Sequence, residues 1–159
     1  MQKKESFKKS IYVLPNLFTS MNLFCGFYAI LSAIDGRFVD ASIAIVIGAI
    51  FDLLDGKIAR ATNTTSQFGV EYDSLADLIT FGLAPALTIY LWALKPFGRL
   101  GWLAGFLFMA CGALRLARFN TSAASGGSSS YFQGLPIPSA AGMAVSTMLF
   151  FDRLDVDPQ

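Results

Sequence analysis

Histidine is absent from the 159-residue sequence, so no imidazole can bind a metal, act as a general base or carry a phosphoryl group. The only two cysteines, Cys25 and Cys111, lie far apart in apolar runs, and this spacing supports neither a zinc site nor a disulfide framework. The formal net charge is only +1, which argues against a protein that binds nucleic acid through bulk electrostatics. These absences exclude histidine-based catalysis and leave no support for a zinc protein or a nucleic-acid binder.

Charge is also scarce, because only 14% of the residues are Asp, Glu, Lys or Arg, against about 25% in soluble chains. Hydrophobic residues make up 54%, and the mean hydropathy is +0.54. A soluble domain of this size leaves roughly a third of its chain surface exposed, and that surface would be mostly apolar here. The composition therefore excludes a soluble globular enzyme and predicts a protein that crosses the membrane several times.

Five segments approach the ~20 apolar residues that a membrane-spanning helix needs. They are 11–34, 41–61, 67–94, 101–119 and 135–151. The first is interrupted at Pro15 and Asn16, so we expect its beginning to lie along the membrane interface, and its apolar run is too long for a cleavable signal. The Ser- and Gly-rich stretch 120–134 is typical of a flexible polar loop. The predicted fold is an all-α, polytopic transmembrane helical bundle, with 1–159 as a single domain.

The basic residues predict the orientation of this bundle, because cytoplasmic loops carry an excess of Lys and Arg. With the N-terminus inside, eight of the 12 basic residues fall on the cytoplasmic side: Lys3, Lys4, Lys8, Lys9, Lys57, Arg60, Arg115 and Arg118. The other four fall on the opposite side: Arg37, Lys95, Arg99 and Arg153. This twofold excess favours an N-inside topology, with the connection between the second and third segments on the cytoplasmic face.

Acidic residues are concentrated where a membrane tolerates them least. Five of the 11 lie between Asp52 and Asp77, with apolar sequence on both sides. A charge in a spanning helix costs ~3 kcal/mol, and such residues usually face a polar cavity or one another. Asp52 and Asp55 are three residues apart, and Asp73 and Asp77 are four apart, so each pair shares one helix face. Two antiparallel helices joined by 62–66 would bring the two pairs face to face.

Four converging carboxylates without His or Cys form an all-oxygen site that suits Mg²⁺, Mn²⁺ or Ca²⁺. We expect more than one ion, because four negative charges in one place repel one another strongly. Gly56, Ala59 and Gly69 beside them leave room for a ligand, and Arg60 is a fixed cation suited to phosphate oxygens. A single aspartate near a helix end is commonly an interfacial anchor, but four on two matched faces argue against that interpretation.

These residues resemble a known signature. The sequence D-x-x-D-G-x-x-A-R begins at Asp52 and, after eight residues, is followed by G-x-x-x-D-x-x-x-D, which begins at Gly69. This arrangement is similar to the signature of the CDP-alcohol phosphotransferases, with all eight fixed positions present. The resemblance implies that two divalent ions, Mg²⁺ or Mn²⁺, bind the pyrophosphate of a CDP-activated lipid or alcohol, and that a second alcohol displaces CMP.

The resemblance also implies roles for single residues. Asp52, Asp55 and Asp73 match the metal ligands, and Asp77 matches both a ligand of the second metal and the catalytic general base. Seven further residues match positions that accommodate the CDP moiety: Gly56, Ala59, Arg60, Ser66, Gly69, Asn16 and Thr19. Asn16 and Thr19 belong to the short pattern 15–19, which is similar to the start of the family's first helix, where they would contact the phosphates.

The runs 113–120 and 132–138 resemble the membrane-embedded phosphatidylserine synthase branch of this family in bacteria and archaea. That resemblance implies CDP-diacylglycerol and L-serine as substrates, and phosphatidylserine and CMP as products. Arg115 and Arg118 share a helix face and would hold the serine carboxylate or a phosphate, together with Asn120. The alternative is that both arginines are positive-inside anchors. Phosphatidylserine synthases related to phospholipase D need a catalytic histidine, so that class is excluded.

The family core has six spanning helices and usually forms a homodimer, whereas five segments are visible here. We therefore expect a sequence truncated at its C-terminus, or two helices merged in our segmentation. Gly101 and Gly105 form a GxxxG pattern for helix packing, either within the chain or between copies. The expected location is the inner membrane, with the active site on the cytoplasmic side, where serine meets the head of a membrane lipid.

Two other functions stay open at this stage. The signature determines CDP chemistry but not the acceptor, so glycerol phosphate or inositol phosphate could replace serine. A divalent-cation transporter is disfavoured, because a pathway across the bilayer needs polar lining groups. The runs 41–51 and 78–94 offer only Ser42, Thr80, Thr88 and Tyr90.

Overall fold

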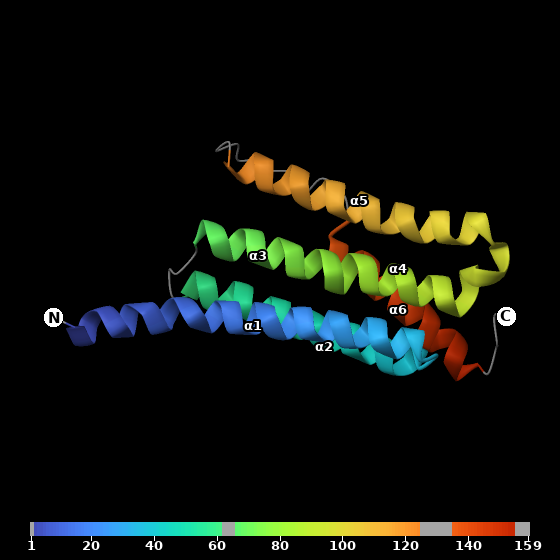
Figure 1. Cartoon of the computed structure of the whole chain (residues 1–159), viewed down its shortest axis with the longest axis horizontal. Helices are drawn as coiled ribbons and strands as arrows, with labels where there is room; N and C mark the ends of the chain where they lie inside the picture. Colours follow the sequence, from blue (N-terminus) through green and yellow to red (C-terminus); the bar gives the residue numbers. More distant parts are fainter. Residues whose placement is uncertain (1, 62–65, 125–134, 155–159) are drawn as a thin grey trace.

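The first two helices form an antiparallel hairpin (Figure 1). The computed structural model describes residues 2–61, 66–124 and 135–154, with side chains described for 16–61, 66–121 and 135–154. Helix α1 spans Gln2–Ile34 and α2 spans Phe38–Ala61. Gly36 lies in the turn between them with φ +77°, a backbone conformation that glycine adopts without steric strain. The apolar runs of both segments thus become two long helices packed along each other.

After α2, residues 67–97 form one continuous helical rod that is not uniformly α-helical. It consists of α3 (Gln67–Asp77), the π-helical turn η1 (Leu78–Leu83), α4 (Ala84–Ile89), a second π-helical turn η2 (Tyr90–Leu94) and the 3₁₀ turn η3 (Lys95–Phe97). The amide of Ala84 bonds to the carbonyl of Ile79, five residues back, and Pro85 follows it without an N–H of its own. Such π turns are frequent at functional sites, and η1 begins directly after Asp77.

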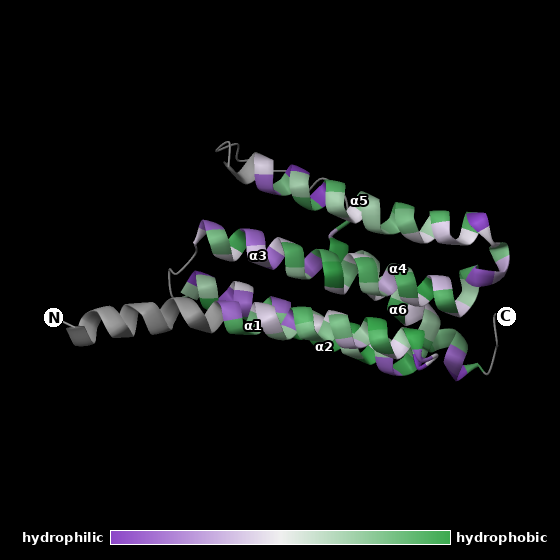
Figure 2. Ribbon diagram, viewed as in Figure 1, coloured by the Kyte–Doolittle hydropathy of each residue, from purple (hydrophilic) through white to green (hydrophobic). Residues whose placement is uncertain are grey.

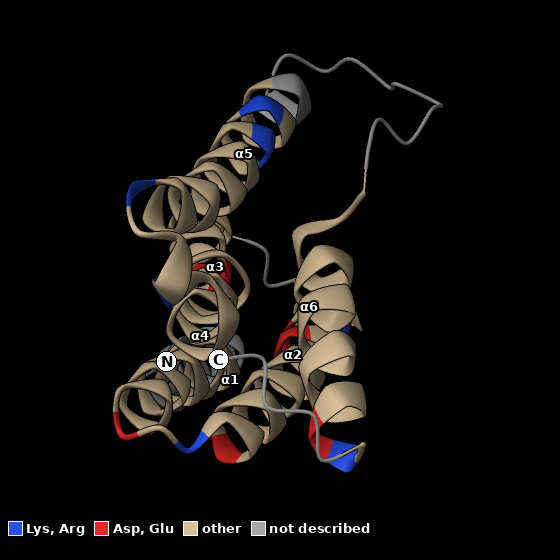
Figure 3. Cartoon of the chain, turned by 90° about the vertical axis from the view of Figure 1, so that its right-hand side faces the viewer, with Lys and Arg blue, Asp and Glu red and all other residues tan. Residues whose placement is uncertain are grey.

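The last two helices lie on different sides of this rod. Helix α5 (Arg99–Ala124) begins after Gly98, whose φ is +55°, and runs back along α4 and η1. Helix α6 (Ile137–Arg153) packs instead against α2 and the α4 region. Figure 3 shows α6 beside α2, and α5 on the far side of the α3–α4 rod. The end of α5 consequently lies at the same end of the bundle as the start of α3 (Figure 1).

The packing of the bundle is that of a membrane protein, with small residues inside and large apolar residues outside. Its core is rich in alanine, including Ala29, Ala41 and Ala84, all with an exposed fraction of 0%. Large side chains such as Phe24 and Leu114 are exposed, and much of the ribbon in Figure 2 has the green colour of apolar residues. Without water outside, helices associate through close packing of small residues and interhelical hydrogen bonds.

The all-α transmembrane prediction is confirmed, since the described residues contain helices and no strand, and all five predicted segments fall on helices. Within the part of the chain that the structure describes, three helical stretches are long and apolar enough to cross a membrane: Asn16–Ile34, Gln67–Phe97 and Arg99–Thr121. Helix α1 is continuous through Pro15. One expected boundary was wrong, because α5 continues to Ala124 and Asn120 is therefore helical. Of the predicted loop, 125–134 lies outside the described residues.

The GxxxG pattern on α5 serves packing within the chain. A Cβ on Gly101 would collide with the carbonyl oxygen of Leu94, and a Cβ on Gly105 would lie 3.3 Å from the carbonyl oxygen of Ala86. Both carbonyls belong to the α4–η2 part of the same chain. These two glycines therefore let α5 pack closely against the α4–η2 segment of the same chain. Of the two uses predicted for the pattern, this is packing within the chain.

The closest approach of α1 to η1 occurs at Gly26, which yields a stability prediction. A Cβ built there would lie 2.8 Å from the Cα of Thr80. We expect Gly26→Ala to destabilise the protein by about 1–3 kcal/mol, because the two backbones must separate. Gly142→Ala is the control, since a Cβ on Gly142 meets nothing within 4 Å. Thermal unfolding in detergent compares the two, and equal melting temperatures would contradict this account of the contact.

Candidate active site

The aspartates of the motif meet at one end of the bundle. Asp52 and Asp55 lie on α2, and Asp73 and Asp77 lie on α3. One carboxylate oxygen from each of Asp52, Asp55 and Asp73 lies within 4.8 Å of the other two. Asp77 is adjacent, with its carboxyl group within hydrogen-bonding reach of Asp52. The structure thus brings the two predicted faces together across the α2–α3 hairpin.

Helix α1 supplies a hydrogen-bond donor to one aspartate on each of these helices. The hydroxyl Oγ1 of Thr19 donates to Oδ2 of Asp55 at 2.8 Å, in a buried position. The amide Nδ2 of Asn22 donates to Oδ1 of Asp77 at 3.0 Å. Figure 2 shows hydrophilic colour on neighbouring parts of α1, α2 and α3 at this end of the bundle. Three helices, and not two, therefore build the carboxylate cluster.

The cluster has the character of a divalent-cation site. All of its candidate ligand atoms are carboxylate oxygens, the type preferred by Mg²⁺, Mn²⁺ and Ca²⁺. Asp55 is buried, and Oδ1 of Asp73 is buried without a hydrogen-bond partner among the described residues. A buried carboxylate oxygen that no protein group satisfies is strongly disfavoured unless a cation lies beside it. The residues present therefore fit a bound divalent ion.

The residues predicted to contact CDP lie around the start of α3 and the end of α2. Ser66 caps α3, because its Oγ accepts the amide N–H of Gly69 at 3.0 Å. A Cβ on Gly69 would lie 3.6 Å from Oδ1 of Asn16, so α1 approaches the start of α3 here. Arg60 is exposed, and its Nε donates to the carbonyl of Gly56 at 2.8 Å. Ala59 is half-buried on the same helix.

The predicted serine-binding residues lie near the end of α5. Asn120 donates from Nδ2 to Oγ of Ser74 at 2.9 Å, which joins α5 to α3 directly beside Asp73. Arg115 is half-buried and Arg118 is exposed, and basic residues gather at this end of α5 in Figure 3. Residues 132–134 of the second predicted run lie outside the described part of the chain. The structure thus brings Asn120 close to the carboxylate helix.

Sequence reasoning missed three residues that organise the site. Asn22 bonds Asp77, Ser74 bonds Asn120, and Thr80 donates from Oγ1 to the carbonyl of Asn22 at 3.0 Å. Asn22 offered a signal, because it is a polar residue within an apolar segment, three positions after Thr19. Ser74 and Thr80 offered none, since hydroxyl groups in spanning helices commonly bond their own backbone.

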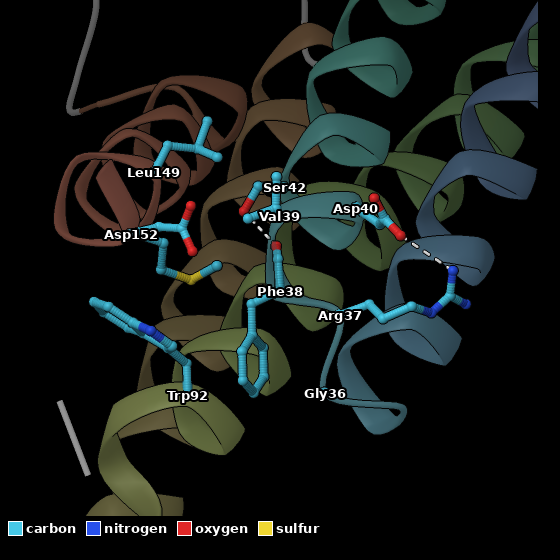
Figure 4. A pocket seen from close by; sticks show the side chains of 10 residues that line it. Gly36, Arg37, Phe38, Val39, Asp40, Ser42, Trp92, Leu149 and Asp152 are labelled. Atoms are coloured by element: carbon cyan, nitrogen blue, oxygen red, sulfur yellow. Dashed lines mark hydrogen bonds and ion pairs between the residues drawn. The ribbon is translucent and has the colours of Figure 1, made fainter. Parts of the chain in front are cut away.

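A separate cavity of about 290 Å³ lies at the opposite end of the bundle, around the α1–α2 turn (Figure 4). Its wall includes Trp92 and Asp152, but none of the four motif aspartates. Arg37 beside it forms ion pairs with Asp40 at 3.1 Å and with Asp35 at 3.3 Å. Hydrogen bonding to Tyr28 and to Asp35 raises the pKa of the Arg37 guanidinium. Among the described residues that line this cavity, Arg37 is the only basic one, and it is paired with two carboxylates.

The fold and the site together define an integral membrane protein with an all-carboxylate cluster between α2 and α3 whose composition fits a divalent cation. The CDP-alcohol phosphatidyltransferase family model matches residues 12–156, so the chain belongs to this family. The resemblance found in the aspartate motif is thereby confirmed.

Several relatives with assigned names are similar to this chain over most of its length. The chain is 47% identical over 143 residues to the CDP-diacylglycerol–serine O-phosphatidyltransferase of Helicobacter pylori, covering 90% of this chain and 60% of that protein. It is 42% identical over 134 residues to the archaetidylserine synthase of Methanothermobacter thermautotrophicus, covering 83% and 56%. It is 38% identical over 162 residues to the serine O-phosphatidyltransferase of Saccharomyces cerevisiae, covering 89% and 57%. The chain thus spans about 60% or less of the length of these relatives.

Proposed function

We propose that this protein transfers the phosphatidyl group of CDP-diacylglycerol to L-serine, giving phosphatidylserine and CMP. The observation that carries the proposal is the convergence of Asp52, Asp55 and Asp73 within 4.8 Å, in a chain whose relatives are named for this reaction or its archaeal counterpart. The proposal treats the whole chain, 1–159, as one catalytic domain.

The carboxylates have separate roles in this proposal. Asp52, Asp55, Asp73 and Asp77 hold two divalent ions, Mg²⁺ or Mn²⁺. When bound, these ions neutralise the pyrophosphate of the substrate and the phosphate of departing CMP. Asp77 accepts the proton of the serine hydroxyl as its oxygen attacks the lipid-side phosphorus and the bond to CMP breaks. Asn22 donates to Oδ1 of Asp77, and we assign the proton to Oδ2, the other oxygen of the same carboxyl group.

The substrate-binding roles follow the position of each residue. We assign the nucleotide to the end of α2 and the start of α3, where Asn16 approaches Gly69. Seven residues form this proposed CDP site: Gly56, Ala59, Arg60, Ser66, Gly69, Asn16 and Thr19. We assign the serine carboxylate to Arg115, Arg118 and Asn120, and the bond from Asn120 to Ser74 beside Asp73 supports this assignment. The acyl chains stay in the bilayer between helices.

The setting of the reaction is part of the proposal. We place the enzyme in the inner membrane, with the aspartates at the cytoplasmic side, because the excess of Lys and Arg favours that orientation. We also propose a homodimer. The exposed apolar face of α5, which includes Leu100, Phe106 and Leu114, is compatible with contact to lipid or to a second copy.

An acceptor competition tests the proposal. Purified full-length protein with CDP-diacylglycerol and Mn²⁺ receives labelled serine, and glycerol phosphate or inositol phosphate is added in excess as a competitor. We expect labelled lipid and CMP in equal amounts, with little loss to either competitor. Loss of the labelled lipid in the presence of one competitor, while CMP release continues, would assign a different acceptor within the family. Metal flux into liposomes without release of CMP would favour a transporter.

A further inference from the structure

Two polar side chains on α1 approach the carboxylate cluster from the same helix face. Thr19 and Asn22 are three residues apart, and their exposed fractions are 3% and 0%. Thr19 donates to Oδ2 of Asp55 on α2, and Asn22 donates to Oδ1 of Asp77 on α3. Helix α1 thus donates one side-chain hydrogen bond to a carboxylate of α2 and one to a carboxylate of α3. Each bond involves one of the two oxygens of its carboxylate.

The position of Asn22 is itself fixed by close packing. Its backbone carbonyl accepts the Oγ1 hydroxyl of Thr80 at 3.0 Å, and Gly26 permits the approach of α1 to η1. A Cβ on Gly48 would lie 3.1 Å from Oδ1 of Asn22, so α2 also confines this side chain. A fixed donor holds the carboxylate that it bonds in one orientation, which a mobile surface side chain could not do.

Asn22 is a poor choice for packing alone. Its Oδ1 is buried and has no hydrogen-bond partner among the described residues, and such an orphaned acceptor destabilises a fold. A leucine, which is branched at the same atom but has no polar group, would avoid this penalty. The amide is therefore explained by its Nδ2 donor, and the acceptor of that donor is Asp77.

We propose that Thr19 and Asn22 are positioning residues, each of which holds one oxygen of a site carboxylate in a fixed orientation. The inference rests on the proposed function and reassigns Thr19 from the CDP phosphates to Asp55. Both donors are neutral, so they orient a carboxylate without cancelling the charge that attracts a cation. Groups that orient metal ligands in this way typically change affinity or activity by 10–100-fold when they are removed.

A purely structural role makes a different prediction. If the two bonds only hold α1 against α2 and α3, their removal lowers the melting temperature and leaves ion binding and turnover intact. Thr88→Val is the matched control, because Thr88 is a buried threonine whose hydroxyl bonds within its own helix, to the carbonyl of Ala84 at 2.6 Å. Like Thr19→Val, this variant loses a threonine hydroxyl in a spanning helix, but at a position away from the cluster.

The first measurement needs no acceptor alcohol. Binding of Mn²⁺ to purified full-length variants is followed by the loss of the free-ion electron paramagnetic resonance signal. We expect Thr19→Val to weaken binding by about tenfold or more, and Thr19→Ser, which keeps the hydroxyl, to restore it. Thr88→Val should bind as wild type does. If Thr19→Val does not fold, Thr19→Ala lacks the same hydroxyl and takes its place in the comparison.

The second measurement concerns Asn22→Leu and separates kcat from KM. We expect kcat to fall by about 10–100-fold, with little change in the KM for CDP-diacylglycerol, because the lipid still binds while the proton acceptor is misoriented. Equal Mn²⁺ binding in Thr19→Val and Thr19→Ser, or a wild-type kcat in Asn22→Leu, would overturn the inference. Wild-type protein that makes no serine product but shows the expected Mn²⁺ differences would overturn only the proposed function.

Discussion

Asp77→Asn is expected to lower the rate of CMP release by about a thousandfold, within the range that general-base catalysis contributes. Asparagine has nearly the same shape, and its Oδ1 can still accept the bond from Asn22, so the fold of the site should persist. The amide cannot take up the proton of the serine hydroxyl. Initial rates with labelled serine at saturating Mn²⁺ measure the effect.

The control for this experiment is Asp152→Asn, which changes an exposed carboxyl group on α6 at the cavity end of the bundle. We expect it to turn over as wild type does. Asp77→Asn that keeps the wild-type rate would show that another group accepts the proton. A normal rate with a raised Mn²⁺ requirement would instead make Asp77 a ligand only.

Asp73→Asn is expected to abolish both metal binding and activity, with a loss of about a hundredfold or more. Oδ1 of Asp73 is buried and has no hydrogen-bond partner among the described residues. No described protein group therefore satisfies this oxygen in place of a cation. Wild-type protein should be stabilised by Mn²⁺, by about 2.7 kcal/mol at a hundred times its dissociation constant. The variant should gain no such stabilisation.

The same substitution should have the opposite effect once metal is removed. In a chelator, wild-type carboxylates of Asp52, Asp55 and Asp73 repel one another within 4.8 Å. Removing one charge relieves that repulsion, so Asp73→Asn should melt at a higher temperature than wild type. Glu71→Gln is the matched control, because Glu71 is an exposed acid on the same helix. If Mn²⁺ stabilises Asp73→Asn as much as it stabilises the wild type, Asp73 is not a ligand of the metal.

Much of the fold could be predicted because the membrane imposes a strong length and composition rule. The segment 67–94 was expected as one span and is one rod, although its two π turns were not expected. The first of them, η1, ends just before Ala84 and Pro85 and packs closely against Gly26, and neither feature changes the hydropathy pattern. Helix α1 continues through Pro15, because proline alone does not decide whether a helix ends.

The candidate site was predicted only in part, for a similar reason. Helical spacing places Asp52 with Asp55 and Asp73 with Asp77 on shared faces, and these positions follow from 3.6 residues per turn. The partners of these acids come from α1, which is separated from them by tens of residues. No spacing rule connects Asn22 to Asp77, since their contact depends on how α1 crosses the α2–α3 hairpin.

The sequence by itself determined that this is a helical membrane protein of the CDP-alcohol phosphotransferase type, because apolar length, helical period and an eight-position motif are local properties. Only the tertiary structure decided which carboxylates converge within 4.8 Å, and that Thr19 and Asn22 each hold one of them. The physical reason is that a hydrogen bond needs a donor and an acceptor about 3 Å apart. Only the packing of three helices against one another establishes that distance.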